Sequence, residues 1–124
     1  MRKTGISLFL IISAFFIVYS PMNLRAEDSA ISILNYSLKP GGYVDDNKSL
    51  QTIYNIELKN NQGTAHSFSL KIVFYDKAKN QLKESKKKYE IQANETKKFS
   101  DVILIDAEMG KQISSTKGFI EDVQ

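Results

Sequence analysis

The sequence predicts an all-β protein, a small sandwich of six or seven short antiparallel strands, from three observations. Apolar and polar residues alternate over most of the chain after Ala26, which is the period of a strand with one dry face and one wet face. Turn-forming residues separate these segments at roughly ten-residue intervals. The long apolar run without alternation lies near the N-terminus, where it resembles a leader rather than part of the sheet.

The N-terminal segment has the three parts of a signal peptide. Arg2 and Lys3 supply positive charge, residues 6–19 form an apolar run of 14 residues, and Ala26 is the small residue before the cleavage point. A helix of that length spans roughly 21 Å, whereas a bilayer core needs about 20 apolar residues. We therefore expect a signal-peptide helix within residues 1–26 and cleavage after Ala26. An uncleaved membrane anchor is the alternative.

Cleavage would change the charge and size of the protein. Removing 26 of the 124 residues leaves a single domain over residues 27–124, with 98 residues. The chain holds 17 Lys and Arg against 14 Asp and Glu, and the leader carries Arg2, Lys3 and Arg25, so the mature domain is formally neutral. We therefore expect no nucleic-acid partner, because such binding needs a basic domain. The chain has no cysteine, which excludes disulfides and a cysteine-linked lipid anchor.

The alternating pattern predicts six strands. Their ranges are 30–38, 50–59, 66–75, 82–91, 97–105 and 112–120. Pro40-Gly41-Gly42 and residues 45–48 predict a polar first connection, and residues 106–111 are either a short helix or a loop. The second and third strands carry the clearest apolar face. The residues expected to be buried together are Tyr54, Ile56, Leu58, Phe68, Leu70, Ile72 and Phe74.

The third strand and the turn after it suggest a family. Residues 72–82 resemble the hairpin of bacterial extracytoplasmic domains of the FxLYD type, in which an aromatic–Asp pair ends a strand and an aliphatic residue begins the next. Residues 94–99 are similar to the later Gly-Glu-Thr-x-x-Phe segment of such domains, and residues 56–60 are similar to a strand that ends in Asn. The resemblance covers residues 50–105. It implies an immunoglobulin-like or fibronectin-like sandwich without catalytic residues, in an exported bacterial protein.

The sequence contains no constellation that specifies a reaction. His66 is the only histidine, and it lacks the neighbouring ligands of a metal site. Ser114-Ser115-Thr116 has no glycine elbow or paired base that would activate a nucleophile. Asp45-Asp46 is typical of a polar turn. We therefore expect no enzyme, no cofactor and no metal.

A cluster of lysines is the most distinctive feature of the mature chain. Lys86, Lys87 and Lys88 are consecutive, so their charges fall on both faces of one strand, which a central strand cannot bury. We therefore expect residues 82–91 to form an edge strand or to lie beside one. The six residues of this candidate site, which we call the lysine patch, are Lys83, Lys86, Lys87, Lys88, Lys97 and Lys98.

Two interpretations of the lysine patch remain open. Lysines on an edge strand prevent pairing with other chains. They also attract an acidic protein or an anionic envelope surface. The sequence thus favours a secreted or periplasmic, non-catalytic binding module, with no membrane span after signal cleavage. The alternative is an accessory or chaperone-like subunit of an envelope assembly that uses a free strand edge.

Overall fold

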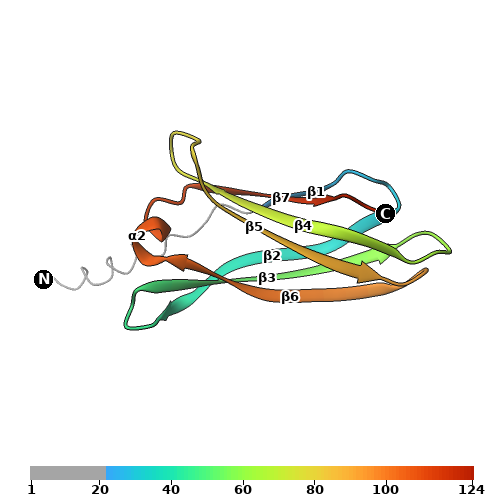
Figure 1. Cartoon of the computed structure of the whole chain (residues 1–124), viewed down its shortest axis with the longest axis horizontal. Helices are drawn as coiled ribbons and strands as arrows, with labels where there is room; N and C mark the ends of the chain where they lie inside the picture. The colour runs from blue at the N-terminus through green and yellow to red at the C-terminus, as the bar shows by residue number, and fades with distance from the viewer. Residues whose placement is uncertain (1–21) are drawn as a thin grey trace, which may run out of the picture.

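The structure, a computed structural model, describes residues 22–124, and the predicted signal-peptide helix lies mostly outside them. These residues form seven strands and almost no helix (Figure 1), which confirms the predicted all-β class. In chain order the elements are β1 (Asn23–Ala26), β2 (Ile31–Val44), β3 (Ser49–Asn60), β4 (His66–Tyr75), β5 (Gln81–Ile91), β6 (Thr96–Asp106), the helix α2 (Ala107–Gly110) and β7 (Ser115–Glu121). No helix among the described residues combines the length and apolarity needed to cross a membrane.

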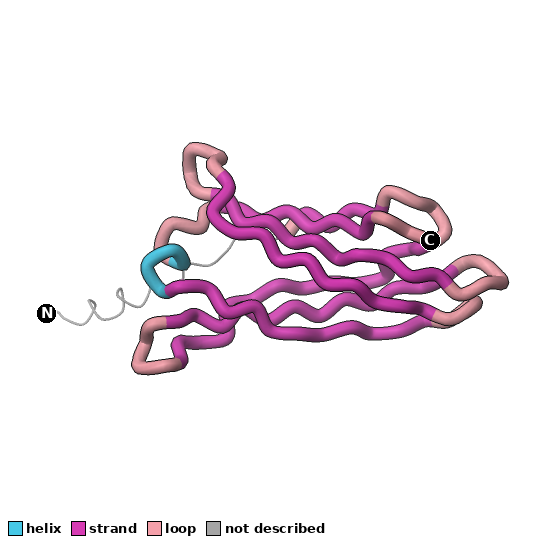
Figure 2. Tube along the Cα trace, in the orientation of Figure 1, coloured by secondary structure: helices cyan, strands magenta, loops and turns pink. Residues whose placement is uncertain are grey.

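The strands form two sheets that lie face to face (Figures 1 and 2). One sheet has the order β1-β7-β4-β5 and the other has the order β2-β3-β6. Every pair of neighbours is antiparallel except β1 and β7, which run parallel. The pairs β3–β6 and β4–β7 join strands that are not consecutive, as the B–E and C–F pairs do in an immunoglobulin-like sandwich.

The core lies between the sheets and contains the predicted apolar face. The seven residues expected there, from Tyr54 to Phe74, are each at most 2 % exposed. Ile105 of β6 and Ile120 of β7 complete the same cluster, with Met22 and Leu24 at one side. The two-residue period therefore identified both the strands and the faces that they bury.

The first predicted connection is partly wrong. Strand β2 does not end at Leu38 but continues through Pro40 and the two glycines to Val44. A register shift between Pro40 and Gly42 inserts one residue, and the bulge keeps the strand paired with β3. A Cβ at Gly41 would lie 2.7 Å from Ile53 Cδ1, so the end of the Ile53 side chain packs against the backbone of the bulge.

The segment between β6 and β7 is a short helix followed by a turn. The Asp106 carboxylate accepts hydrogen bonds from the backbone amides of Glu108 and Met109, which caps the first turn of α2. The backbone amides of Gln112 and Ile113 then donate to carbonyls of this helix. These bonds explain why β7 begins at Ser115 rather than at the expected residue 112.

Strand β1 lies in the segment that the sequence assigns to the leader. It pairs with residues 117–120 of β7. Leu24 within β1 is 7 % exposed, and Met22, just before the strand, is 3 % exposed. The Glu27 amide also donates to the Ile120 carbonyl at 3.1 Å. Cleavage after Ala26 would remove this strand from the sheet.

Candidate interaction surface

The lysine patch lies on two edge strands. β5 is the last strand of the four-stranded sheet and pairs only with β4, which confirms that the lysine strand is an edge. β6 is the last strand of the three-stranded sheet, and it runs beside β5 along the same flank (Figure 1). The fold therefore places Lys97 and Lys98 on the strand that lies beside the lysines of β5.

The patch is divided over three surfaces, because neighbouring residues on a strand point in opposite directions. Lys87 is paired with Leu70 and Lys97 with Leu58, so both lie on core-facing sides, at the rim where the two sheets meet. Lys88 pairs with Ser69 on the outer face of the four-stranded sheet. Lys98 lies on the outer face of the other sheet.

Two lysines of the patch are paired with acids of the same chain. Lys87 forms an ion pair with Asp101 across the flank, and their hydrogen bond raises the pKa of Lys87 and lowers the pKa of Asp101. Lys86 Nζ lies 3.3 Å from Asp122 Oδ2 and 3.6 Å from Glu121 Oε2. Its hydrogen bond with Asp122 raises the pKa of Lys86. Such exposed pairs orient side chains but contribute little to stability.

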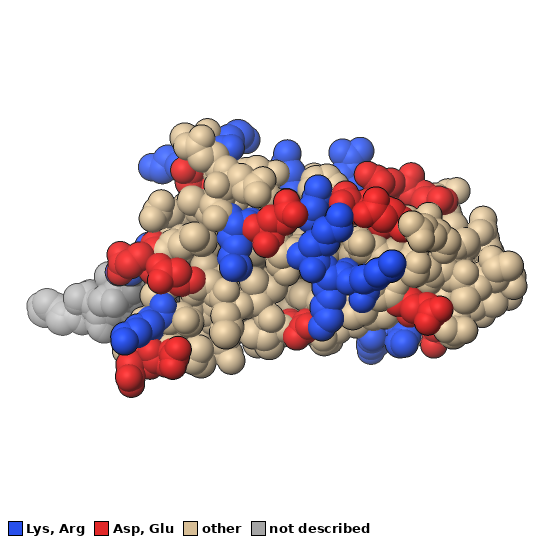
Figure 3. Space-filling model, viewed as in Figure 1, with Lys and Arg blue, Asp and Glu red and all other residues tan. Residues whose placement is uncertain are grey.

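The other four lysines of the patch form no ion pair with any residue from 22 to 124. Lys83, Lys88 and Lys98 carry unpaired charges, and the Lys97 ammonium lies 5.5 Å from the centre of the Phe99 ring. Figure 3 shows basic side chains gathered in a band on the face where β4, β5 and β6 lie. The unpaired Lys88 and Lys98 lie on the outer faces of different sheets, and Lys97 lies at the rim between them.

An aromatic cluster lies beneath the flank. The ring centroids of Tyr89 and Phe99 are 4.6 Å apart, and those of Phe68 and Phe99 are 5.5 Å apart in an edge-to-face arrangement. The hydroxyls of Tyr54 and Tyr89 form a hydrogen bond between the two sheets, and burial raises the pKa of Tyr54 above the usual range for tyrosine. These contacts hold β5 and β6 in a defined geometry beneath the lysines. The alternating pattern did not indicate this cluster, because it joins residues from four strands.

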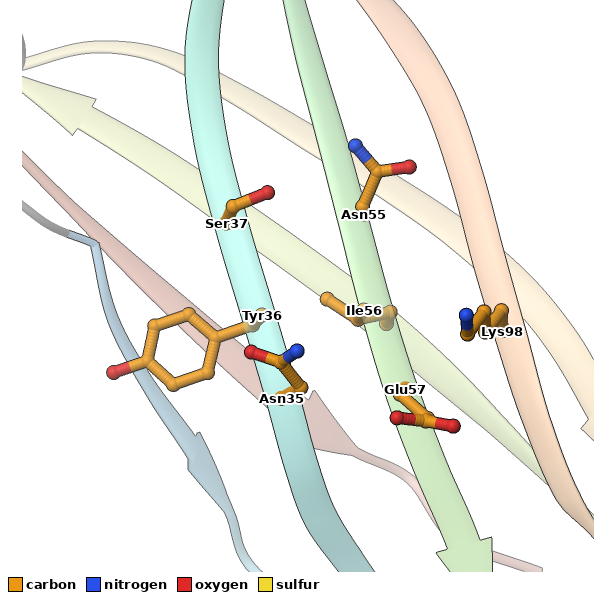
Figure 4. A pocket seen from close by; sticks show the side chains of 7 residues that line it. All are labelled: Asn35, Tyr36, Ser37, Asn55, Ile56, Glu57 and Lys98. Atoms are coloured by element: carbon orange, nitrogen blue, oxygen red, sulfur yellow. The ribbon is translucent and has the colours of Figure 1, made fainter.

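A shallow polar cavity of about 280 Å³ lies on the outer face of the three-stranded sheet (Figure 4). It is lined by Asn35, Tyr36, Ser37, Asn55, Ile56, Glu57 and Lys98. The Ser100 hydroxyl donates to Asn55 Oδ1 beside it. The cavity offers amide, carboxylate and ammonium groups to a small polar ligand, and it connects to the lysine patch through Lys98. The sequence did not predict this cavity, because its alternating pattern indicates only that these residues lie on a solvent-facing side of a strand.

The remaining candidate residues have structural contacts. His66 begins β4, and its ring nitrogens lie 3.0 Å from the Gln124 carbonyl oxygen and 2.7 Å from Gln62 Oε1, which ties the last residue to the sheet. Residues 45–47 form the tight turn between β2 and β3, and all three have positive φ. From residue 22 onward, no three acidic, histidine or cysteine side chains are grouped as metal ligands would be.

Comparison with known proteins identifies likenesses of fold alone. No family model and no curated protein matches the chain, so no family match supports the FxLYD-type resemblance. One similar solved structure is the Northeast Structural Genomics Consortium target SoR45, with 10% identity, 78% of this chain and 85% of that chain covered, and a TM-score of 0.48. Another is a DUF1425 family member from Shewanella sp. pv-4, with 7% identity, coverage of 79% and 94%, and a TM-score of 0.43.

Proposed function

We propose that this protein is an exported, non-catalytic interaction module that binds an acidic protein or an anionic envelope surface through the flank formed by β5 and β6. One observation carries the proposal. Four lysines on two neighbouring edge strands form no ion pair with any described residue. The leader-like N-terminal segment supports export to the periplasm or the exterior.

Edge protection alone accounts for only part of this arrangement. A charge on β5 suffices to discourage pairing with another strand. Lys98 of the edge strand β6, however, also lines the polar cavity on the outer face of its sheet. A local excess of positive charge on a neutral domain attracts an acidic surface and orients it during encounter.

The test reverses three unpaired charges and leaves the two ion-paired lysines intact. The patch variant is Lys83→Glu, Lys88→Glu and Lys98→Glu. The control variant is Lys39→Glu, Lys48→Glu and Lys77→Glu, which changes the net charge equally at exposed lysines elsewhere. Each protein is tested for sedimentation with anionic phospholipid vesicles and for capture of partners from envelope extract, at low and high salt.

We expect wild type and control to bind at low salt and to lose binding at high salt, because exposed charges are screened beyond a Debye length of about 8 Å at physiological ionic strength. The patch variant should not bind at either salt concentration. Equal binding by all three proteins would contradict docking and would leave edge protection as the account of the lysines.

The second candidate function is that of an accessory or chaperone-like subunit of an envelope assembly, which uses a strand edge. The observation that favours it lies on the opposite side of the sheet from β5. The outer edge of β7 is covered by only one short strand, β1, which precedes the expected cleavage point.

A further inference from the structure

The edge of the four-stranded sheet beside β7 is occupied by β1, the first strand of the described part of the chain, rather than by a strand that follows β7. When β2 to β7 are matched in order to the A, B, C, C′, E and F strands of an immunoglobulin-like sandwich, the G strand belongs beside β7. Among the described residues, no strand after β7 occupies that position. β1 occupies it instead, and it runs parallel to β7 over four residue pairs, whereas β4 pairs with β7 over seven.

β1 fits this position through its side chains as well as its backbone. Met22 and Leu24 are buried, and Ala26 packs against the same core. Gly118 of β7 provides the space for them. A Cβ at Gly118 would lie 2.8 Å from Leu24 Cδ1 and 3.0 Å from Met22 Sδ. The edge of β7 therefore accepts a strand with bulky apolar residues at two alternate positions and a small residue at the third.

The residues that fill this position also form the end of the predicted leader. Cleavage after Ala26 would uncover the backbone groups of residues 117–120 and the apolar surface around Gly118 and Ile120. An uncovered apolar edge is prone to pair with another chain, because its amides and carbonyls lack partners. A domain that loses β1 therefore presents a strand-binding site of defined shape.

We propose that β1 is a replaceable strand, and that the mature domain binds in its place an extended segment of another envelope protein. This inference rests on the second proposed function and on cleavage after Ala26. The bound segment runs parallel to β7 and has the spacing of Met22, Leu24 and Ala26: bulky, any residue, bulky, any residue, small. Main-chain hydrogen bonds provide affinity in such strand addition, and the pockets for alternate side chains provide specificity.

The first measurement is the intact mass of the exported protein, which should correspond to residues 27–124. The second is binding of a synthetic peptide with the sequence of residues 22–28 to that exported protein. We expect saturable binding and a higher melting temperature, because a ligand that binds only the folded state stabilises it. A control peptide exchanges Met22 with Asn23, which keeps the composition and makes the Met and Leu side chains adjacent, so that they point to opposite faces in every register.

Two glycine variants test the location of the site. In the exported protein, Gly118→Val should weaken binding of the native peptide about tenfold or more, a change of at least about 1.4 kcal/mol, because its side chain occupies the space of Leu24. Gly63→Val is the control, since nothing lies within 4 Å of a Cβ at that loop position. If Gly118→Val does not fold, the difference in binding between the native and control peptides still tests whether the site recognises the side chains of β1.

The outcomes separate this inference from the proposed functions. An exported protein that still carries residues 22–26 would overturn strand replacement, because the position stays filled. Equal binding of the native and exchanged peptides would also overturn it. If the exported protein captures one envelope assembly but does not bind the native peptide, the result supports the accessory function and contradicts strand replacement. The patch variant, Lys83→Glu, Lys88→Glu and Lys98→Glu, should bind the native peptide normally, because those lysines lie on β5 and β6, away from the edge of β7.

Discussion

Lys87 of β5 and Asp101 of β6 form an ion pair that joins the edge strands of the two sheets. The three consecutive lysines therefore differ in their surroundings. Lys86 is paired with Glu121 and Asp122, Lys87 with Asp101, and Lys88 with no acid among residues 22–124. The central lysine of the run contributes to the geometry of the flank, and its neighbour Lys88 is available to a partner.

The Lys87–Asp101 pair predicts a pH-dependent contribution to stability. The hydrogen bond lowers the pKa of Asp101, so its contribution is present above the ordinary aspartate pKa and is lost as pH falls through the lowered value. The same bond raises the pKa of Lys87, whose contribution is lost as pH rises through that raised value. Urea midpoints of wild type and Asp101→Asn should therefore differ most near neutral pH and converge in strong acid. An undiminished difference in strong acid would contradict this assignment.

Tyr54 should not ionise while the domain is folded. Burial raises its pKa, and the hydrogen bond with Tyr89 raises it further. In an alkaline titration followed by phenolate absorbance, Tyr54→Phe should leave the amplitude before unfolding unchanged. The neutral Tyr54 stabilises the fold below the ordinary tyrosine pKa, and this stabilisation is lost as pH rises above it. A smaller phenolate amplitude before unfolding in Tyr54→Phe than in wild type would contradict this prediction.

Phe74 should contribute far more to stability than Phe119, although both are phenylalanines on neighbouring strands. Phe74 is fully buried between the sheets, whereas Phe119 lies partly exposed under the Lys71 ammonium. Phe74→Ala should cost about 3–5 kcal/mol of unfolding free energy, a large share of the stability of a small domain. Chemical denaturation measures both variants. Similar small losses would mean that the buried face of β4 is assigned wrongly.

Two buried threonines should respond in opposite ways to the same substitution. Thr116 Oγ1 is buried without a hydrogen-bond partner in the described part of the chain. Thr116→Val replaces that hydroxyl by a methyl group and should leave stability unchanged or raise it by about 1 kcal/mol. Thr52 is also buried, and its hydroxyl is not among the buried groups without a partner, so Thr52→Val should destabilise by about 1 kcal/mol. Melting temperatures of the two variants provide the comparison, and destabilisation by Thr116→Val would show that its hydroxyl is paired.

The sequence by itself determined the strands and their buried faces. Side chains on a strand alternate with a period of two, so Tyr54, Phe68 and Phe74 could be assigned to the core from local order alone. The position of β5 at an edge was predictable as well, because three consecutive lysines place charge on both faces of a strand. The end of β2 was not predictable in this way, since the bulge between Pro40 and Gly42 depends on pairing with residues of β3.

Only the tertiary structure decided how the strands pair and what each lysine meets. The alternation that identifies β6 does not predict that β6 pairs with β3 and lies beside β5, because these arrangements depend on contacts between residues distant in sequence. Asp101 thus became the partner of Lys87, while Lys98 was placed beside the polar cavity. The same reason accounts for β1. Local order identifies residues 22–26 as the end of a leader, and only the shape of the β7 edge over Gly118 shows that they also fill a position in the sheet.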